Sequence, residues 1–357
     1  MFEERVDPLD QLQDPNNLSK YKAAGLIATK AVTEIVNKAK DGISLLELYQ
    51  LGNNYITNEC NKIYKDVKYK GYAFPVCLSK NNIAGHYIPK KDDVLKDGDL
   101  LKIELGVHID GYPAFIAFTT LVCNDSNING KKANVLKAVI EASKEIVNVM
   151  KPNKTNKDVM KIMEKYAQKY NCNLPLYNDN EFDIIPGILS FQVSRGVIDG
   201  YNNDSDEFVH QLIQSRENIN TDLVLREIAF EENEVYAVDV LMSTGTGKLI
   251  NTGETHIFRR NYDVYEGLKL KTSREVISSF GKELFPISLD QSNTRVKLGL
   301  KECIDKRLLE TYPVVKEKDD EFIARVKFTV IVRDSPILVC AKPTNDELKK
   351  IKNNICE

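Results

Sequence analysis

A single carboxylate, Glu104, lies in the middle of an apolar run that has the pattern of a β-strand. The run is LLKIELGV, residues 100–107, and Ile103 and Leu105 flank the acid. A strand that is apolar on both faces is expected to be covered on both. A buried carboxylate is unfavourable unless a metal ion, a substrate or a basic side chain compensates its charge. The first question that the sequence raises is therefore which of these three Glu104 faces.

The other residues that could carry chemistry form no short catalytic motif. None of the four histidines has the H-E-x-x-H spacing of a zinc site: His86, His108, His210 and His256. The chain has no G-x-S-x-G elbow, no P-loop and no Rossmann fingerprint after a strand. The stretch GTGK at 245–248 lacks the first glycine of a P-loop, so we expect no phosphate there. His86 lies in a predicted loop, and taken alone it is expected to be an ordinary surface residue.

Composition excludes several classes of protein. The 357 residues are 42% hydrophobic, which is enough for a large core. Lys and Arg number 49 against 52 Asp and Glu, so only a local patch could attract nucleic acid or a membrane. The seven cysteines include no C-x-x-C pair, which argues against a zinc module or a disulfide framework. No run approaches the roughly 20 apolar residues of a membrane helix, and the acidic start does not resemble a signal peptide. We expect a soluble intracellular protein without a cofactor.

The strand that carries Glu104 is predicted to be half of a β-hairpin. Asp110-Gly111 supplies the turn, and residues 114–122 form a second apolar, β-branched run. Periodicity and turn residues predict the preceding elements: a helix at 17–39 capped by Asn17 or Ser19, a helix to about Tyr64 opened by a capping box at Ser44–Glu47, and a strand at 72–78.

The same order of elements occurs again after residue 125. The pattern predicts a helix at 132–150, a second helix to about Tyr170 after a capping box at Thr155–Asp158, an apolar stretch at 184–197, and a strand pair at 235–242 and 254–259 around the turn 243–247. This order indicates a duplicated α/β unit, residues 17–125 and 131–260. Two such halves packed face to face would place Glu104 and Asp239 on facing strands around a shared cleft.

The remaining segments complete one predicted α+β domain, residues 16–345. Composition and periodicity assign a disordered lead-in at 1–15, a polar surface insertion at 201–222, a helical insert at 265–313 with helices at 273–280 and 295–309, two strands at 322–332 and 336–340 that complete the sheet, and a basic tail at 346–357.

Five stretches occur in an order that resembles the landmarks of a known family. They are AFPVCLSKNNIAGHYIP, DGDLLKIELGVHIDGYPAFIAFT, NEVYAVDVLMSTGTGK, LGLKECIDKRLLETYPVV and EFIARVKFTVIV, between about Lys20 and Cys340. The chain resembles the type-2 methionine aminopeptidase branch of peptidase family M24, and within it the proliferation-associated (ErbB-receptor-binding) proteins. This resemblance implies the pita-bread fold, in which two related α/β units form a curved antiparallel central sheet flanked by helices. The helical insert before the last strands is the mark of the type-2 branch.

The resemblance also assigns the positions of a dinuclear metal site. Active aminopeptidases hold two metal ions with two aspartates, a histidine and two glutamates, whose lone pairs bind the ions that activate water. In this chain the five positions hold Glu104, Phe115, Phe191, Asp239 and Lys327. Two phenylalanines offer no lone pair and a lysine repels a cation, so we expect no metal and no peptidase activity. His86 falls at the position of a substrate-contacting histidine and is interpreted as retained scaffold.

Lys327 offers an answer to the question of what Glu104 faces. Its ammonium group could supply the positive charge that the metal ions supply in the active enzymes. We therefore predict a buried or half-buried ion pair between Lys327 and Glu104, Asp239 or both. Breaking such a pair leaves an uncompensated charge and typically costs about 3–5 kcal/mol.

The family implies a role outside the cleft. Its members are ribosome- and RNA-associated adaptors in ribosome biogenesis, translation and growth control, in cytoplasm and nucleolus. The resemblance therefore implies ribosomal RNA and ribonucleoprotein partners for a monomer without membrane contact, and it leaves protein partners open. The predicted contacts are basic residues of the insert: Lys269, Lys271, Arg274, Arg295, Lys297 and Lys301. Interleaved glutamates leave a plain solvated helix face as the competing interpretation.

Other interpretations remain open at this point. A lysine–tyrosine cluster at 62–70 could meet phosphates and bases, or could be an exposed helix end. The lysine-rich tail of animal family members is reduced here to Lys349–Lys352, which leaves open whether binding that depends on that tail is kept. His86 beside Glu104 keeps a metal-free hydrolase as an alternative, in the manner of creatinase-like members of the fold. A peptide-binding scaffold without catalysis is the third alternative.

Overall fold

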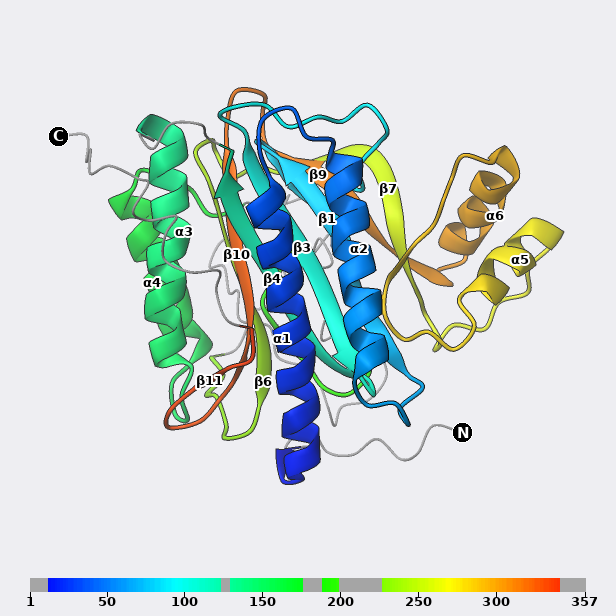
Figure 1. The fold of residues 1–357 in the computed structure, drawn as a ribbon, viewed down its shortest axis with the longest axis horizontal. Coiled ribbons are helices and arrows are strands. Elements are labelled where there is room, and N and C mark those ends of the chain that lie inside the picture. Colours follow the sequence, from blue (N-terminus) through cyan, green and yellow to red (C-terminus); the bar gives the residue numbers. More distant parts are fainter. Residues whose placement is uncertain (1–11, 123–128, 176–187, 199–226, 341–357) are drawn as a thin grey trace.

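A curled antiparallel sheet forms the centre of the protein, with four helices on its outer side (Figure 1). The computed structural model describes residues 12–122, 129–175, 188–198 and 227–340. The helices are α1 (Pro15–Lys38), α2 (Leu45–Lys62), α3 (Gly130–Val149), α4 (Asn156–Lys169), α5 (Lys271–Ser279) and α6 (Thr294–Asp305). The strands are β1 (Lys70–Lys80), β2 (Ile83–Gly85), β3 (Leu100–Ile109), β4 (Tyr112–Leu121), β5 (Phe191–Gln192), β6 (Val235–Ser243), β7 (Ile250–Arg260), β8 (Ile287–Ser288), β9 (Leu309–Lys316), β10 (Ile323–Ile331) and β11 (Ile337–Leu338).

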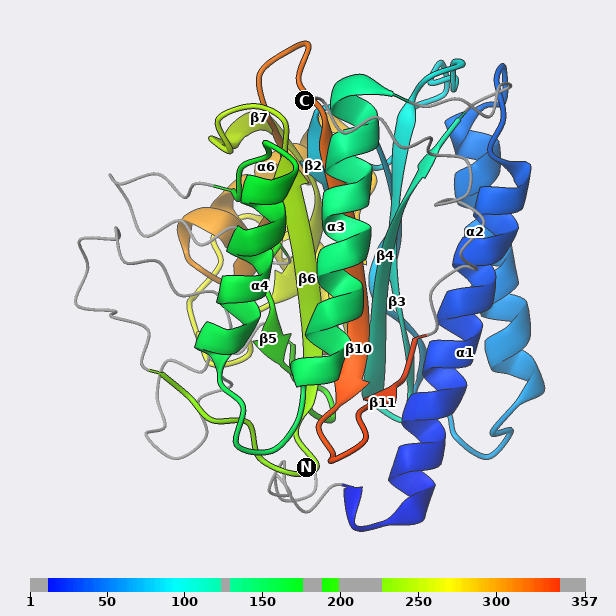
Figure 2. The ribbon, with the colours of Figure 1, turned by 90° about the vertical axis from the view of Figure 1, so that its left-hand side faces the viewer.

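Two sheets divide these strands. The main sheet has the order β1-β3-β4-β10-β6-β5, with β11 paired to β10. α1 and α2 pack on β1, β3 and β4, whereas α3 packs on β10 and β6 and is itself covered by α4, as Figure 2 shows. The second sheet has the order β2-β9-β7-β8 and carries the helical insert, which projects from one side of the molecule (Figure 1). None of the helices in the described part of the chain has the length and apolar content to cross a membrane.

The hairpin β3–β4 lies at the heart of the larger core. Every residue of both strands is buried, which fits the apolar composition of both faces. Asp110 and Gly111 both adopt positive φ, the conformation that a two-residue hairpin turn with this twist requires. Helix α1 packs on both strands, and Gly25 lets the chain at Val339 approach it, because a Cβ there would lie 2.1 Å from the Val339 carbonyl oxygen. The predicted hairpin is confirmed.

The predicted helices are also found, with small differences at their ends. α1 starts at Pro15 and is capped by Asp14, which accepts a hydrogen bond from the Asn16 amide, instead of by Asn17 or Ser19. Leu12 is buried, so the described end of the predicted lead-in belongs to the core. Ser44 caps α2 without a side-chain hydrogen bond, so the predicted capping box is not formed there. At α4, Asp158 accepts from the Thr155 amide as predicted.

The predicted strand pair after residue 234 is wrong as a hairpin. β6 belongs to the main sheet, where its long neighbour is β10, whereas β7 leaves the turn and pairs with β9 in the second sheet. The first half of β7 is exposed and contains few apolar residues, which explains why the sequence predicted this strand only from residue 254. As a consequence Glu104 and Asp239 lie on strands of one sheet, not on facing strands of two halves.

The end of the predicted insert also needs correction. The helix predicted at 295–309 ends earlier, because α6 stops at Asp305. The last residues of the predicted insert, 309–313, belong to strand β9. Arg307 adopts a positive φ of 57° between them and ends the helix. The predicted surface insertion at 201–222, the basic tail at 346–357 and most of the lead-in lie outside the described residues.

Candidate functional site

Glu104, Lys327 and Asp239 lie in one row across the main sheet. Glu104 of β3 pairs with Ala117 of β4, Ala117 also pairs with Lys327 of β10, and Lys327 pairs with Asp239 of β6. Alternate residues of a strand share a face, so residues two positions away point to the same side. The register thus gathers side chains from four strands that no local pattern connects.

Arg325, two residues before Lys327, is the principal partner of both acids. Its Nη1 and Nη2 lie 2.7 Å from the two carboxylate oxygens of Glu104, a bidentate pair. Its Nε lies 2.8 Å from Asp239 Oδ1, and Nη2 lies 2.5 Å from Oδ2. The planar guanidinium therefore bridges the two carboxylates. A lysine could not make this contact, because it carries one nitrogen instead of a fork.

Lys327 also lies close to both acids. Its Nζ is 3.4 Å from Asp239 and 3.9 Å from Glu104, which are ion-pair distances. The ammonium also lies over two aromatic rings, 4.9 Å from the centre of Phe191 and 5.7 Å from that of Phe115. The ion pairs predicted for Lys327 are therefore present, although they are looser than those of Arg325.

The cluster is buried and electrically balanced. The side chains of its two acids and two bases are at most 5% exposed. Burial by itself lowers the pKa of Arg325, but the Asp239 and Glu104 carboxylates outweigh that effect and raise it, so the guanidinium stays charged. Two negative and two positive charges sum to zero. Such a network is tolerated inside a protein because each charge has a partner.

The residues present do not fit the two metal ions that the resemblance implies. The buried rings of Phe115 and Phe191 have no lone pair to donate, and the ammonium of Lys327 repels a cation. The guanidinium of Arg325 already bonds all four oxygens of the two remaining acids. Within the described ranges, no group of three or more His, Cys, Asp or Glu side chains is placed to hold a metal ion.

His86 is a core residue, so its expected place on the surface is wrong. The side chain is fully buried between the rings of Phe74 and Tyr312. Nδ1 lies 3.0 Å from the Pro313 carbonyl, which can only accept, so Nδ1 carries the proton. Burial lowers the pKa of His86, and the imidazole is neutral. The preceding Gly85 explains the close fit, since a Cβ there would lie 2.7 Å from Arg325 Nη1.

The glycine-rich loop at 243–247 is filled by an acid of the chain itself. The buried Glu317 accepts hydrogen bonds from the Gly247 amide at 2.7 Å and from the Ser243 hydroxyl at 3.0 Å. A Cβ on Gly245 would lie 2.8 Å from the Glu317 carboxyl carbon. The loop does bind an anion, but that anion is internal. This geometry agrees with the expectation that no phosphate binds there.

The six basic residues predicted for the insert are all exposed. Some are engaged locally: Lys271 pairs with Glu275, Lys301 with Asp305, and Arg274 donates to backbone carbonyls. The other three, Lys269, Arg295 and Lys297, form no ion pair with any described residue. Tyr265 and Leu298 are the most exposed large apolar side chains on the same insert.

The lysine–tyrosine cluster at 62–70 is built into the fold. Tyr69 stacks with Phe285, packs at a tilt against His108 and donates a hydrogen bond to Glu283, so its ring is not available to stack on a base. Lys70 donates to the carbonyls of Ile63 and Tyr64 at the end of α2. These contacts favour the interpretation as a helix end over that as a nucleic-acid site, although Tyr69 and Lys70 are packed into the fold instead of exposed.

Arg325 is the residue that sequence reasoning missed. A signal for it was present: in EFIARVKFTVIV, Arg325 and Lys327 alternate with apolar residues, and a period of two places them on one face. The resemblance drew attention to Lys327 alone, because Arg325 does not stand at a ligand position.

Comparison with known proteins places the chain in a family. The model of metallopeptidase family M24 matches residues 19–238, more than half of the chain. The chain belongs to metallopeptidase family M24. The M24 relatives include the ERBB-3 binding protein 1 of Solanum tuberosum, which is 35% identical over 92% of this chain and 82% of its own length. The curved DNA-binding protein of Schizosaccharomyces pombe is 32% identical over 96% of this chain and 88% of its own.

Solved structures show the M24 fold over more than nine tenths of the chain. A thermophilic Arx1 superposes with a TM-score of 0.78 at 23% identity and covers 95% of both chains. A methionine aminopeptidase of Thermotoga maritima gives a TM-score of 0.58 at 14% identity, over 92% of this chain and 98% of the enzyme. The pita-bread fold and the resemblance to the proliferation-associated proteins are thereby confirmed.

Proposed function

We propose that this M24 protein is not a peptidase and acts as an adaptor for ribosomes and their RNA. The observation that carries the first half is the position of Arg325 between Glu104 and Asp239. A metallopeptidase needs those carboxylate oxygens for metal ions that activate water. Here all four oxygens are hydrogen-bonded to a guanidinium that has no route to deprotonation at physiological pH.

The surface of the insert supports the proposed role as an adaptor for ribosomes and RNA. Lys269, Arg295 and Lys297 are exposed cations without acidic partners among the described residues, and phosphate contacts are the main source of nucleic-acid affinity. The relative named curved DNA-binding protein carries a nucleic-acid ligand in its name. Under this proposal the protein works as a monomer in the cytoplasm and the nucleolus, with ribosomal RNA and ribonucleoprotein complexes as partners.

Co-sedimentation of the full chain with ribosomes tests the adaptor role. The measurement is repeated between about 50 and 200 mM salt, because phosphate contacts make the binding constant fall as salt rises. Each phosphate contact that a variant loses should make the plot of log binding constant against log salt less steep by about 0.7–0.9. The charge-reversal variant Lys269→Glu/Arg295→Glu/Lys297→Glu is expected to lose most of its binding. Lys22→Glu/Lys30→Glu/Lys38→Glu, on the exposed side of α1, makes the same change in charge and should bind like the wild type. Equal losses in the two variants would contradict the proposal.

A peptidase assay independently tests the proposal that the protein is not a peptidase. We expect no turnover of a peptide with N-terminal methionine, with or without added cobalt or manganese. Measurable turnover that disappears in Glu104→Gln would show that the cluster supports catalysis after all. Such turnover would contradict the non-peptidase proposal only, and the conclusion from the ribosome co-sedimentation would still stand.

A further inference from the structure

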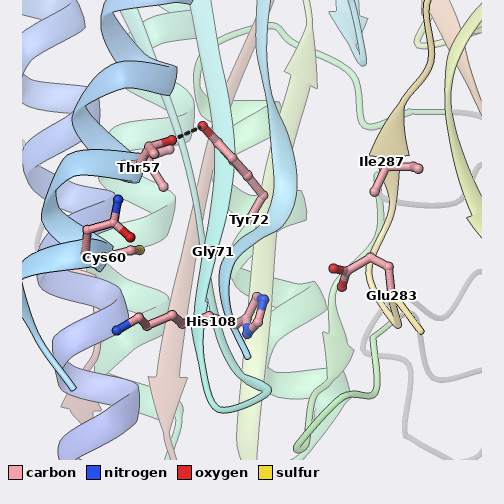
Figure 3. A pocket seen from close by; sticks show the side chains of 10 residues that line it. Thr57, Cys60, Gly71, Tyr72, His108, Glu283 and Ile287 are labelled. Atoms are coloured by element: carbon pink, nitrogen blue, oxygen red, sulfur yellow. Dashed lines mark hydrogen bonds between the residues drawn. The ribbon is translucent and has the colours of Figure 1, made fainter. Parts of the chain in front are cut away.

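A cavity of about 240 Å³ lies between helix α2, strand β1 and the helical insert (Figure 3). Thr57 and Cys60 of α2 line one wall, and Glu283 and Ile287 of the insert line the other (Figure 3). Because β1 is the outermost strand at this side of the main sheet, the cavity extends around its edge from one face of the sheet to the other. The cavity shares no residue with the cluster around Arg325.

Glu283 is the only acid among the described residues that line the cavity, and one of its oxygens is unpaired. Its Oε1 accepts hydrogen bonds from the Tyr69 hydroxyl at 2.7 Å and from the amides of Leu284 and Phe285 at 3.1 and 3.2 Å. Its Oε2 has no hydrogen-bond partner among the described residues, and the carboxylate points across the cavity toward β1 (Figure 3). Three donors therefore fix the carboxylate and leave one oxygen for a ligand.

The imidazole of His108 does not neutralise this acid. Its Nδ1 accepts a hydrogen bond from the Gly111 amide at 3.2 Å. The rings of Tyr69 and Phe285, with centres 4.4 and 4.5 Å away, pack against it at a tilt. Burial lowers the pKa of His108 to about 3, so the ring is neutral at physiological pH.

Lys70, the one cation among the described lining residues, points away from Glu283. Gly71 pairs with His108, and successive residues of a strand point to opposite faces, so Lys70 lies on the face opposite to His108. Its Nζ donates to the carbonyls of Ile63 and Tyr64 at the end of α2, at 2.7 and 2.8 Å. No ion pair joins Lys70 or any other cation of the described residues to Glu283.

The space beside the carboxylate is open and uncharged. A Cβ on Gly71 would have no atom within 4 Å, so the cavity is open over that residue. Ile287 on the insert and Ile56 on α2 add apolar walls. Burial raises the pKa of the Cys60 thiol to about 11, so this group of the α2 wall is neutral too. Such a lining accommodates a hydrocarbon chain.

We propose that this cavity binds a primary alkylammonium ion, with its ammonium group on Glu283 Oε2 and its alkyl chain over Gly71, between Ile287 and Ile56. A carboxylate without a partner, in an otherwise uncharged recess, is complementary to a cation, and hydrogen bonds between ionised groups are the strong ones. The cavity is smaller than the usual drug-sized pocket, which suits a chain of about four carbons.

The geometry of Glu283 favours an ammonium group over other cations. A guanidinium binds a carboxylate through two parallel hydrogen bonds, but Oε1 already accepts from three donors. A hard metal ion takes several oxygen ligands, and the described lining holds no second carboxylate. An ammonium group is a compact charge that one free oxygen can bind.

The alkylammonium group could belong to a free aliphatic amine or to a lysine side chain of another protein. Two probes distinguish these sources: n-butylammonium chloride, and Nα-acetyl-L-lysine methylamide, which presents the same group on a peptide backbone. Tighter binding of the lysine derivative assigns the site to a protein lysine, and tighter binding of n-butylammonium assigns it to a free amine. The proposal does not depend on ribosome binding and is tested without ribosomes.

An NMR titration of the full chain, with 13C-labelled isoleucine methyl groups, tests the proposal. We expect the Ile56 and Ile287 resonances to shift and saturate with a Kd below about 10 mM for at least one probe, relative to an equal concentration of sodium chloride. Ile250, an exposed isoleucine of β7, should not respond. n-Butanol has the same chain without the charge and should bind at least tenfold more weakly. Absence of a saturable shift with both amines, or equal affinity for n-butanol, would overturn the proposal.

Variants connect the binding to this cavity. Glu283→Gln keeps an oxygen to accept from Tyr69 and removes the charge, so it should weaken binding at least tenfold. Glu275→Gln, at an exposed acid of the same insert, is the matched control and should bind like the wild type. Ile287→Trp fills the cavity without removing a charge and should abolish the shift of Ile56. Unchanged binding in both Glu283→Gln and Ile287→Trp would place the amine elsewhere and overturn the proposal.

Discussion

Arg325 meets Glu104 across an intervening strand. The two terminal nitrogens of the guanidinium lie 2.7 Å from the two carboxylate oxygens, although β4 separates β10 from β3. On β4, the residue paired with Glu104 and with Lys327 is Ala117. Its small side chain leaves the space through which Arg325 and Glu104 touch. The sheet register, and not proximity in the chain, makes the pair.

Removing the guanidinium should destabilise the protein strongly. Arg325→Met keeps the length of the side chain but leaves Glu104 and Asp239 with one loosely placed cation. We expect a loss of about 3–5 kcal/mol in the free energy of unfolding, measured by urea denaturation. Lys327→Met should cost less, since its ion pairs are longer. Arg274→Met, on the exposed insert, is the control and should change stability by less than about 0.5 kcal/mol. A loss below about 1 kcal/mol in Arg325→Met would contradict the assigned role.

Restoring one acidic ligand should not restore metal binding. In Lys327→Glu three acids would surround Arg325, while Phe115 and Phe191 still offer no lone pair. We expect the variant to melt at a lower temperature than the wild type, with no recovery on addition of cobalt or manganese. A metal-dependent rise of more than about 4 °C would correspond to roughly 1 kcal/mol or more of binding energy and would show that the cluster does accept an ion.

Glu234 should make stability depend on pH near neutrality. Burial raises its pKa to about 7, against an ordinary value of 4.5, although Tyr236, Gln192 and the Glu231 amide donate to it. A carboxyl with a raised pKa binds its proton more tightly in the folded state, so its contribution is full below about pH 4.5 and is lost as pH rises through about 7. Between pH 5 and 8 the wild type should lose about 2–3 kcal/mol relative to Glu234→Gln, measured by urea denaturation at each pH.

The control for this pH profile is Glu164→Gln, an exposed acid of α4. It should leave the pH dependence of the wild type unchanged. Parallel profiles for the wild type and Glu234→Gln would show that Glu234 is ionised in the folded protein at pH 5.

A methyl group at Gly25 should separate α1 from Val339, the residue that follows β11. The added Cβ would lie 2.1 Å from the Val339 carbonyl oxygen, too close for any real contact. We expect Gly25→Ala to cost about 1–3 kcal/mol, even though alanine favours a helix over glycine by about 1 kcal/mol. Amide exchange at Val339, which donates to Thr329, should become faster. Leu26→Ala, at an exposed position of the same helix, should leave that exchange rate unchanged.

The sequence alone determined the local elements and the family. Apolar periodicity and turn residues placed the hairpin around Asp110-Gly111 and four helices to within a few residues, because these features depend on near neighbours in the chain. The order of the landmarks identified the fold, and the residue types at the ligand positions predicted the ion pairs of Lys327. Even the need of Glu104 for a partner followed from its apolar surroundings.

The tertiary structure decided which partner Glu104 has. Arg325 lies 221 residues away along the chain, and only the position of β10 between β4 and β6 brings it to Glu104 and Asp239. The same dependence on contacts between distant strands explains why the sequence wrongly predicted that β6 and β7 pair with each other. It also explains why the sequence wrongly predicted a surface position for His86. A period of two tells which residues share a face, but not which strands will be neighbours. Packing of distant strands settles that, and here it placed a guanidinium between the two acids.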